Sequence, residues 1–236
     1  MIGLNSSKCD LIVSWPIHLD YPLWRQQIKA NRDRFAKVIV VFTNMNVGID
    51  YVPFIKEAMV HDNITFLKND IVEAGDDWRN VAINTALRKS TAKWVFFTEQ
   101  DFFFNEEFMD VVEEEMENVR YIRAMVGDRV HPCCLILRKD LLGQTRKYFG
   151  VVKDVYDHFG FLQYELEGEK YFNIPEEYWK HLGGLSQNMI MLKNGEGANY
   201  MPDDFHEYVK DCMKVTVPMH KDFTRLFRDY LGGLKA

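Results

Sequence analysis

The 236-residue sequence has no apolar run approaching the roughly 20 residues that a membrane-spanning helix needs. Lys8 and Asp10 interrupt the apolar residues near its start, which therefore lacks the long apolar core of a signal peptide. Neither the GxGxxG nor the GxxxxGK motif occurs, so the sequence gives no support to a dinucleotide-dependent dehydrogenase or a P-loop protein. From these absences we expect a cytoplasmic protein without a membrane span.

Cysteine is scarce, and its spacing indicates no disulfide framework. The four cysteines are Cys9, Cys133, Cys134 and Cys212. They include no CxxC pair and show no cluster with histidine in the sequence. The adjacent Cys133 and Cys134 cannot bridge each other without strain.

Excess positive charge is also absent. The net charge of -6 argues against a protein that holds duplex nucleic acid mainly by neutralising phosphates. A hydrophobic fraction of 47% and a charged fraction of 27% are ordinary for a globular chain. The length predicts one large domain, or a main domain with a small additional lobe.

Apolar runs typical of buried strands alternate with amphipathic segments over the first two thirds of the chain. We expect strands at 11–15, 37–42, 64–68 and 93–98, and helices at 23–35, 51–60 and from about 75 to 86. This order predicts an α/β fold with a mostly parallel sheet flanked by helices. After residue 105 the rhythm changes to an acidic helix at 106–119 and a strand at 133–137.

The segment Glu99-Gln100-Asp101 follows the apolar strand expected at 93–98. Ligands of open α/β sheets bind outside the carboxyl ends of the strands. Two carboxylates at such an end can hold one hard cation, which in turn neutralises the charge of a diphosphate leaving group. Paired acids also occur as loop or cap residues, so this pattern alone leaves both interpretations open.

Residues 78–101, WRNVAINTALRKSTAKWVFFTEQD, resemble a segment of GT-A glycosyltransferases of the family-2 type. In that family an R-N-x-A helix precedes a strand ending in DxD, which is Glu-Gln-Asp here. The resemblance covers residues 8–195 in element order. It implies a Rossmann-like GT-A fold in which residues 1–105 bind the nucleotide sugar. Residues 106–236 would bind the acceptor in a smaller lobe with a C-terminal helical extension, within one continuous domain.

The activity implied by the resemblance is transfer of a hexosyl or pentosyl group from a nucleotide sugar, with UDP favoured, to an acceptor hydroxyl. The implied cofactor is Mn²⁺ or Mg²⁺, with Asp101 as its direct ligand. Glu99 matches the acid that contacts the metal or the donor ribose. Arg79 matches an arginine near the donor nucleotide, and further donor contacts are implied for Ser14, Trp15, Pro16, Thr43 and Asn44.

His181 precedes Gly183-Gly184, in the region where some GT-A enzymes supply a third metal ligand, with His206 and His220 as rivals. Asp154 matches the acidic position that serves as general base in many inverting members, and Asp157 is the second choice. A capped or hydrogen-bonded structural histidine and a solvated acid remain the alternatives.

Two alternatives to an active glycosyltransferase stay open. A non-catalytic nucleotide-sugar-binding module would explain the glutamate in place of the first DxD aspartate. A sugar-phosphate nucleotidyltransferase would need a glycine-rich basic loop after the first strand, where this chain has Trp15-Pro16-Ile17-His18. The acceptor stays open among a saccharide, a small molecule, a protein and a modified nucleic-acid base.

Overall fold

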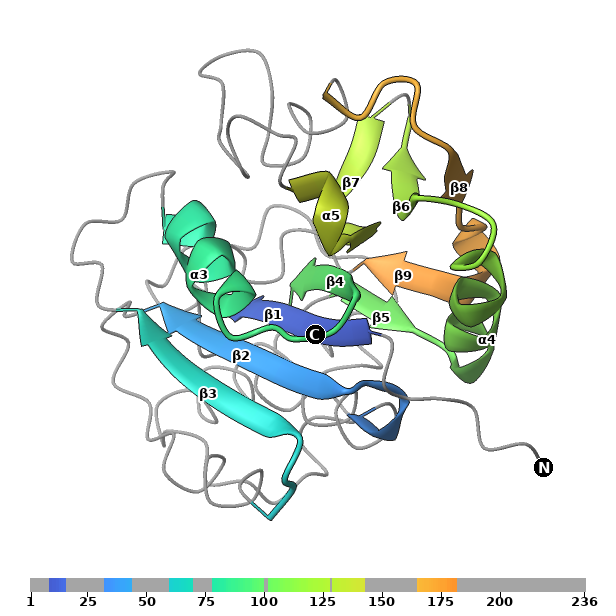
Figure 1. Cartoon of the computed structure of the whole chain (residues 1–236). Helices are drawn as coiled ribbons and strands as arrows, with labels where there is room; N and C mark the ends of the chain where they lie inside the picture. Colours follow the sequence, from blue (N-terminus) through green and yellow to red (C-terminus); the bar gives the residue numbers. More distant parts are fainter. Residues whose placement is uncertain are drawn as a thin grey trace, which may run out of the picture.

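The computed structural model describes residues 9–15, 32–43, 60–69, 78–99, 102–127, 129–142 and 165–181 (Figure 1). No helix in these ranges is long and apolar enough to cross a membrane. The strands are β1 (Cys9–Trp15), β2 (Lys37–Thr43), β3 (Ile64–Asn69), β4 (Trp94–Glu99), β5 (Phe102–Phe104), β6 (Tyr121–Val126), β7 (Arg129–Arg138), β8 (Tyr171–Asn173) and β9 (Trp179–His181). The helices are η3 (Arg32–Arg34), α3 (Trp78–Leu87), α4 (Glu106–Glu115), α5 (Lys139–Leu142) and η4 (Glu176–Tyr178).

A central sheet of seven strands has the order β3-β2-β1-β4-β7-β6-β8. Strands β1, β2, β3 and β4 all run in the same direction, with the pairs β3–β2, β2–β1 and β1–β4. Strand β7 is antiparallel to both β4 and β6, and β8 is parallel to β6. Strands β5 and β9 form a second, two-stranded antiparallel sheet. The predicted α/β class with a mostly parallel central sheet is confirmed.

Both faces of the central sheet are covered, which explains why its strands read as continuous apolar runs. Leu11 and Val13 of β1 belong to one buried cluster and Ile12 to another, as strand alternation requires. Helix α3 contributes Ile83 and Ala86 to the second cluster and packs against β1, β2 and β3. Helix α4 and the small sheet add their apolar residues to the first cluster.

Two of the expected elements differ in extent from the observed ones, and a third lies mostly outside the described residues. The acidic helix ends at Glu115 rather than 119, and a turn follows in which the Asn118 amide donates to the Glu115 carbonyl at 2.9 Å. The strand expected at 133–137 extends over Arg129–Arg138, because it pairs on one side with β4 and on the other with β6. Of the helix expected at 23–35, only the short η3 and the residue after it are described.

Two other expected segments lie almost entirely outside the described residues. Val60, in a turn, is the only described residue of the helix expected at 51–60. The expected C-terminal helical extension lies in 182–236, which the structure does not describe.

Helix α4 is fixed at its start and along one face. The Asn105 side chain accepts a hydrogen bond from the Phe108 amide at 2.9 Å, which caps the helix. Phe108 stacks on Phe96 of β4 with ring centroids 5.6 Å apart. Arg34 of η3 donates to Asp110 at 2.6 Å on the exposed side. The helix is thereby held against the sheet next to β5.

Candidate functional site

The carboxyl ends of the parallel strands meet at one edge of the central sheet. Strand β1 lies between β2 and β4, so the strand order reverses at the β1–β4 boundary. Ser14 of β1 pairs there with Glu99 of β4. Such a reversal opens a crevice outside the strand ends, where α/β proteins bind their ligands. Ser14 and Glu99 therefore lie at the position of this sheet best suited to a ligand.

Two further predicted donor residues lie along the same edge. Trp15 pairs with Phe42, and Thr43 pairs with Asn69. The backbone register thus brings Ser14, Trp15, Thr43 and Glu99 to neighbouring strand ends. Arg79 lies in the first turn of α3, and its side chain is outside the described part of the chain. Other candidates also lie outside it, namely Pro16, Asn44, Asp101, Asp154, Asp157, His206 and His220.

Among the predicted acids Glu99, Asp101, Asp154 and Asp157, Glu99 is the one whose side chain lies in the described part of the chain. It is the last residue of β4 and is only 9% exposed. Its neighbour Thr98 is also buried, at 6% exposed. A carboxylate removed from water in this way needs a hydrogen bond or a cation close by. The Glu99 carboxylate is therefore largely removed from solvent at the end of β4.

The small sheet brings His181 close to the same segment. In the β5–β9 ladder, Phe102 pairs with His181. Phe102 is the residue directly after Asp101 in the sequence. The strand carrying His181 therefore runs beside the chain that follows Glu99-Gln100-Asp101. No local sequence pattern indicates this pairing.

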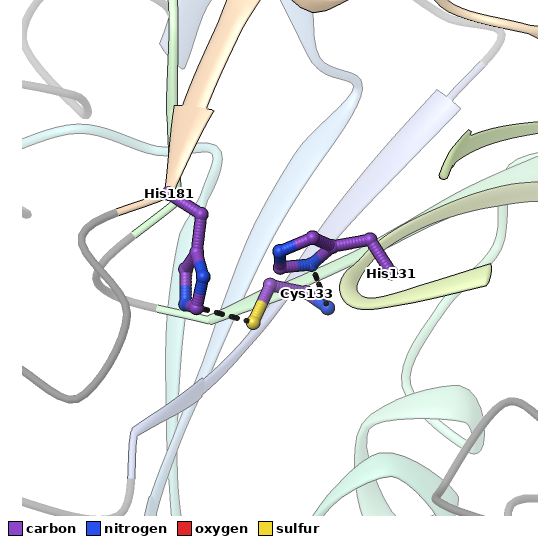
Figure 2. A group of neighbouring side chains, drawn as sticks. All are labelled: His131, Cys133 and His181. Atoms are coloured by element: carbon purple, nitrogen blue, oxygen red, sulfur yellow. Dashed lines mark hydrogen bonds between the residues drawn. The ribbon is translucent and has the colours of Figure 1, made fainter. Parts of the chain in front are cut away.

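His131, Cys133 and His181 form a compact group, here called the His–Cys–His cluster (Figure 2). One potential ligand atom from each residue lies within 4.8 Å of the others. Cys133 Sγ and His181 Nε2 are 3.3 Å apart. The Cys133 amide donates to His131 Nδ1 at 3.0 Å. The sequence spacing did not indicate this cluster, because folding joins Cys133 to a histidine that lies 48 positions away.

An irregularity between β6 and β7 shapes this cluster. The ladder pairs Arg123 with Leu135 and Met125 with Val130, so two steps along β6 correspond to five along β7. His131 and Cys133 lie within the extra residues of β7, where a bulge can redirect side chains. Their spacing of two is the one available signal, because alternate residues of a strand share a face, but the strand expected at 133–137 does not include His131. His181 carries no such signal.

Aromatic rings enclose the cluster. Trp179 lies edge-on to His131 with ring centroids 5.3 Å apart, and Phe102 lies 5.9 Å from the same histidine. Phe102 and Trp179 stack on each other at 5.4 Å. His131 and Cys133 are buried, while His181 is partly exposed. His181 is thus the member of the cluster that is partly exposed to solvent.

No family model matches the sequence, and no curated protein sequence matches it either. Solved structures do share its fold. The mannosyltransferase PcManGT from Pyrobaculum calidifontis, solved in complex with GDP-Man and Mn²⁺, has a TM-score of 0.54 and 14% identity, covering 92% of this chain and 68% of that one.

Two structures of the S. aureus protein TarS also share the fold. S. aureus TarS 1–349 in complex with UDP-GlcNAc has a TM-score of 0.55 and 16% identity, covering 93% of this chain and 69% of that one. Another structure of S. aureus TarS has a TM-score of 0.55 and 15% identity, covering 86% of this chain and 42% of that one. At these identities the similarity establishes the fold, and the predicted GT-A architecture is confirmed.

Proposed function

We propose that this chain is a glycosyltransferase that moves a sugar from a nucleotide-sugar donor to an acceptor hydroxyl. The observation that carries the proposal is the pairing of Ser14 with Glu99 at the reversal point of the parallel sheet. Proteins with this fold have been solved with GDP-Man and with UDP-GlcNAc. We favour a UDP-sugar as donor, with GDP-sugars second. Residues 1–105 would bind the donor and residues 106–236 the acceptor.

The proposed metal ligands are Asp101, Glu99 and His181, and the ion is Mn²⁺ or Mg²⁺. Carboxylate oxygens suit both ions, and the pairing of His181 with Phe102 supports its assignment. When bound, the ion would offset charge on the diphosphate leaving group. PcManGT, which shares the fold, was solved with Mn²⁺.

Donor recognition is assigned to strand-end residues and to the start of α3. The backbone register places Ser14, Trp15 and Thr43 at the carboxyl ends of β1 and β2, and we assign hydrogen bonding and stacking with the donor to their side chains. A guanidinium at Arg79 suits a diphosphate, because it donates several hydrogen bonds in one plane. Pro16 and Asn44 complete the proposed set.

Asp154 is the proposed general base, which takes the proton of the acceptor hydroxyl in an inverting transfer, and Asp157 is the second choice. Asp154→Asn is expected to lower the transfer rate by about 100- to 10,000-fold, because the amide cannot accept the proton. Donor affinity should stay within about threefold. Single-turnover transfer rates and donor titrations measure the two effects separately. A large loss of donor binding would instead assign Asp154 to the donor pocket.

A thermal-shift screen of nucleotides and nucleotide sugars, with Mn²⁺, Mg²⁺ or EDTA, tests the proposed function. A ligand at 100 times its Kd stabilises the folded state by about 2.7 kcal/mol. For a chain of this size that corresponds to a rise in Tm of about 5–10 °C. We expect the rise with one nucleotide class and its loss in EDTA. No stabilisation by any of them, with folded protein verified, would contradict the proposal.

The same screen separates an enzyme from a non-catalytic module. Glu99 in place of the first DxD aspartate is the feature that favours such a module. The stabilising nucleotide sugar is incubated with protein and metal, and release of the free nucleotide is followed. Stabilisation accompanied by metal-dependent release supports the enzyme. Stabilisation without release, for every acceptor class tried, supports the module.

A further inference from the structure

We infer that the His–Cys–His cluster is a binding site for a thiophilic divalent cation, with Zn²⁺ as the physiological ion. The inference goes beyond the proposed function. It assigns a role to Cys133 and His131, which the donor chemistry does not use. It also makes His181 a ligand of this second site, through the nitrogen that lies 3.3 Å from Cys133 Sγ, so that Asp101 and Glu99 remain the proposed ligands of the donor metal. The distances within the cluster, its donor atoms and its enclosure support this assignment.

The distances are close to those of a tetrahedral site. Zinc binds thiolate sulfur at about 2.3 Å and imidazole nitrogen at about 2.0 Å, which separates the two ligand atoms by about 3.5 Å. Cys133 Sγ and His181 Nε2 are already 3.3 Å apart. The remaining separations do not exceed 4.8 Å, so small side-chain rotations complete the geometry. Three protein ligands leave a fourth position for water on the side of the partly exposed His181.

The donor atoms select for a borderline-soft ion. One sulfur and two imidazole nitrogens favour Zn²⁺ over Mn²⁺ or Mg²⁺, which prefer carboxylates and water. Cys133 and His181 share a hydrogen bond in the metal-free cluster, and a metal ion would replace the proton between them. That proton passes to solvent, and the sulfur and nitrogen lone pairs bind the ion.

His131 needs one adjustment to act as a ligand. Its Nδ1 accepts the hydrogen bond from the Cys133 amide. Coordination through Nδ1 exchanges this hydrogen bond for a metal bond, whereas coordination through Nε2 requires the other tautomer. Losing one neutral hydrogen bond costs much less free energy than zinc coordination supplies, so neither route prevents binding.

A metal here would connect two sheets. His131 and Cys133 lie on β7 of the central sheet, whereas His181 ends β9 of the small sheet. β9 pairs with β5, which begins directly after Asp101. Zinc would therefore hold the small sheet in place next to the strand-end crevice. We accordingly expect that a chelator lowers the Tm of the zinc-loaded protein.

The test is a titration of the metal-free protein with Co²⁺ alone, followed by displacement with Zn²⁺ alone. We expect one equivalent to bind with a thiolate-to-cobalt charge-transfer band, and Zn²⁺ to abolish that band. Cys133→Ala should weaken binding by at least about 100-fold and remove the band. Cys134→Ala is the matched control, because burial raises the pKa of this thiol and it lies outside the cluster. Its affinity should change by less than about threefold.

Absence of a thiolate band in the wild-type protein would overturn the inference. A band that persists in Cys133→Ala would overturn it as well. Should Cys133→Ala fail to fold, His181→Gln replaces it, and protection of Cys133 from alkylation by Zn²⁺ in the wild-type chain gives a second readout. The titrations contain no nucleotide, so their failure and a failure of the nucleotide screen are distinct results.

Discussion

Asp101→Asn is expected to lower metal-dependent turnover of the nucleotide sugar by about 100- to 1,000-fold, the range typical of losing one group that stabilises developing charge. The amide keeps the size of the side chain but loses the negative charge that the proposed cation needs. Asp101 follows β4, where Glu99 marks the reversal point of the sheet. Turnover is measured as release of the free nucleotide over a series of Mn²⁺ and Mg²⁺ concentrations.

The folded state should be little affected by Asp101→Asn, because an acid beyond a strand end contributes little to the core. Glu114→Gln is the control, since Glu114 is an exposed acid on α4 and should retain full turnover. Thermal unfolding of both variants should match the wild-type curve within about 2 °C. Unchanged turnover in Asp101→Asn would refute the metal assignment.

Asp10→Ala should produce the largest change in stability, a loss of about 3–5 kcal/mol in the free energy of unfolding. Asp10 lies at the start of β1 and is fully buried. Its Oδ2 accepts hydrogen bonds from Ser90 Oγ at 2.8 Å, from the Thr91 amide at 2.7 Å and from the Ala92 amide at 2.9 Å. Alanine would remove the common acceptor of these three donors, at the connection between α3 and β4.

Two further variants set the scale for Asp10. Ser90→Ala removes one of the three donors and should cost about 1 kcal/mol. Asp33→Ala changes an exposed aspartate of η3 and should stay within about 0.5 kcal/mol of the wild type. Urea denaturation with a common m-value measures all three. A loss for Asp10→Ala no larger than that for Asp33→Ala would show that the carboxylate does not hold this connection.

The residue pattern is sufficient to predict the parallel half of the sheet. The expected strands match β1, β2, β3 and β4 within about one or two residues of their observed bounds, because strands covered on both faces must be apolar throughout. Strand ends in such a sheet share one edge, so the pattern also places Ser14, Thr43 and Glu99 in one region. Short elements escape prediction. Three residues, as in β5 or β9, are too few for a hydrophobic period to appear.

The order of the strands and the His–Cys–His cluster depend on tertiary structure. Glu99 pairs with Ser14 only because β4 lies beside β1 on the side opposite β2. No local residue pattern specifies this arrangement. His181 reaches Cys133 only because β9 pairs with β5 and because β7 accommodates extra residues opposite β6. Propensity and periodicity act over a few neighbouring residues, whereas strand partners are selected by the burial of whole faces. The sequence by itself therefore determined the class of fold and the chemical groups at its strand ends, and the folded chain decided which of those groups meet.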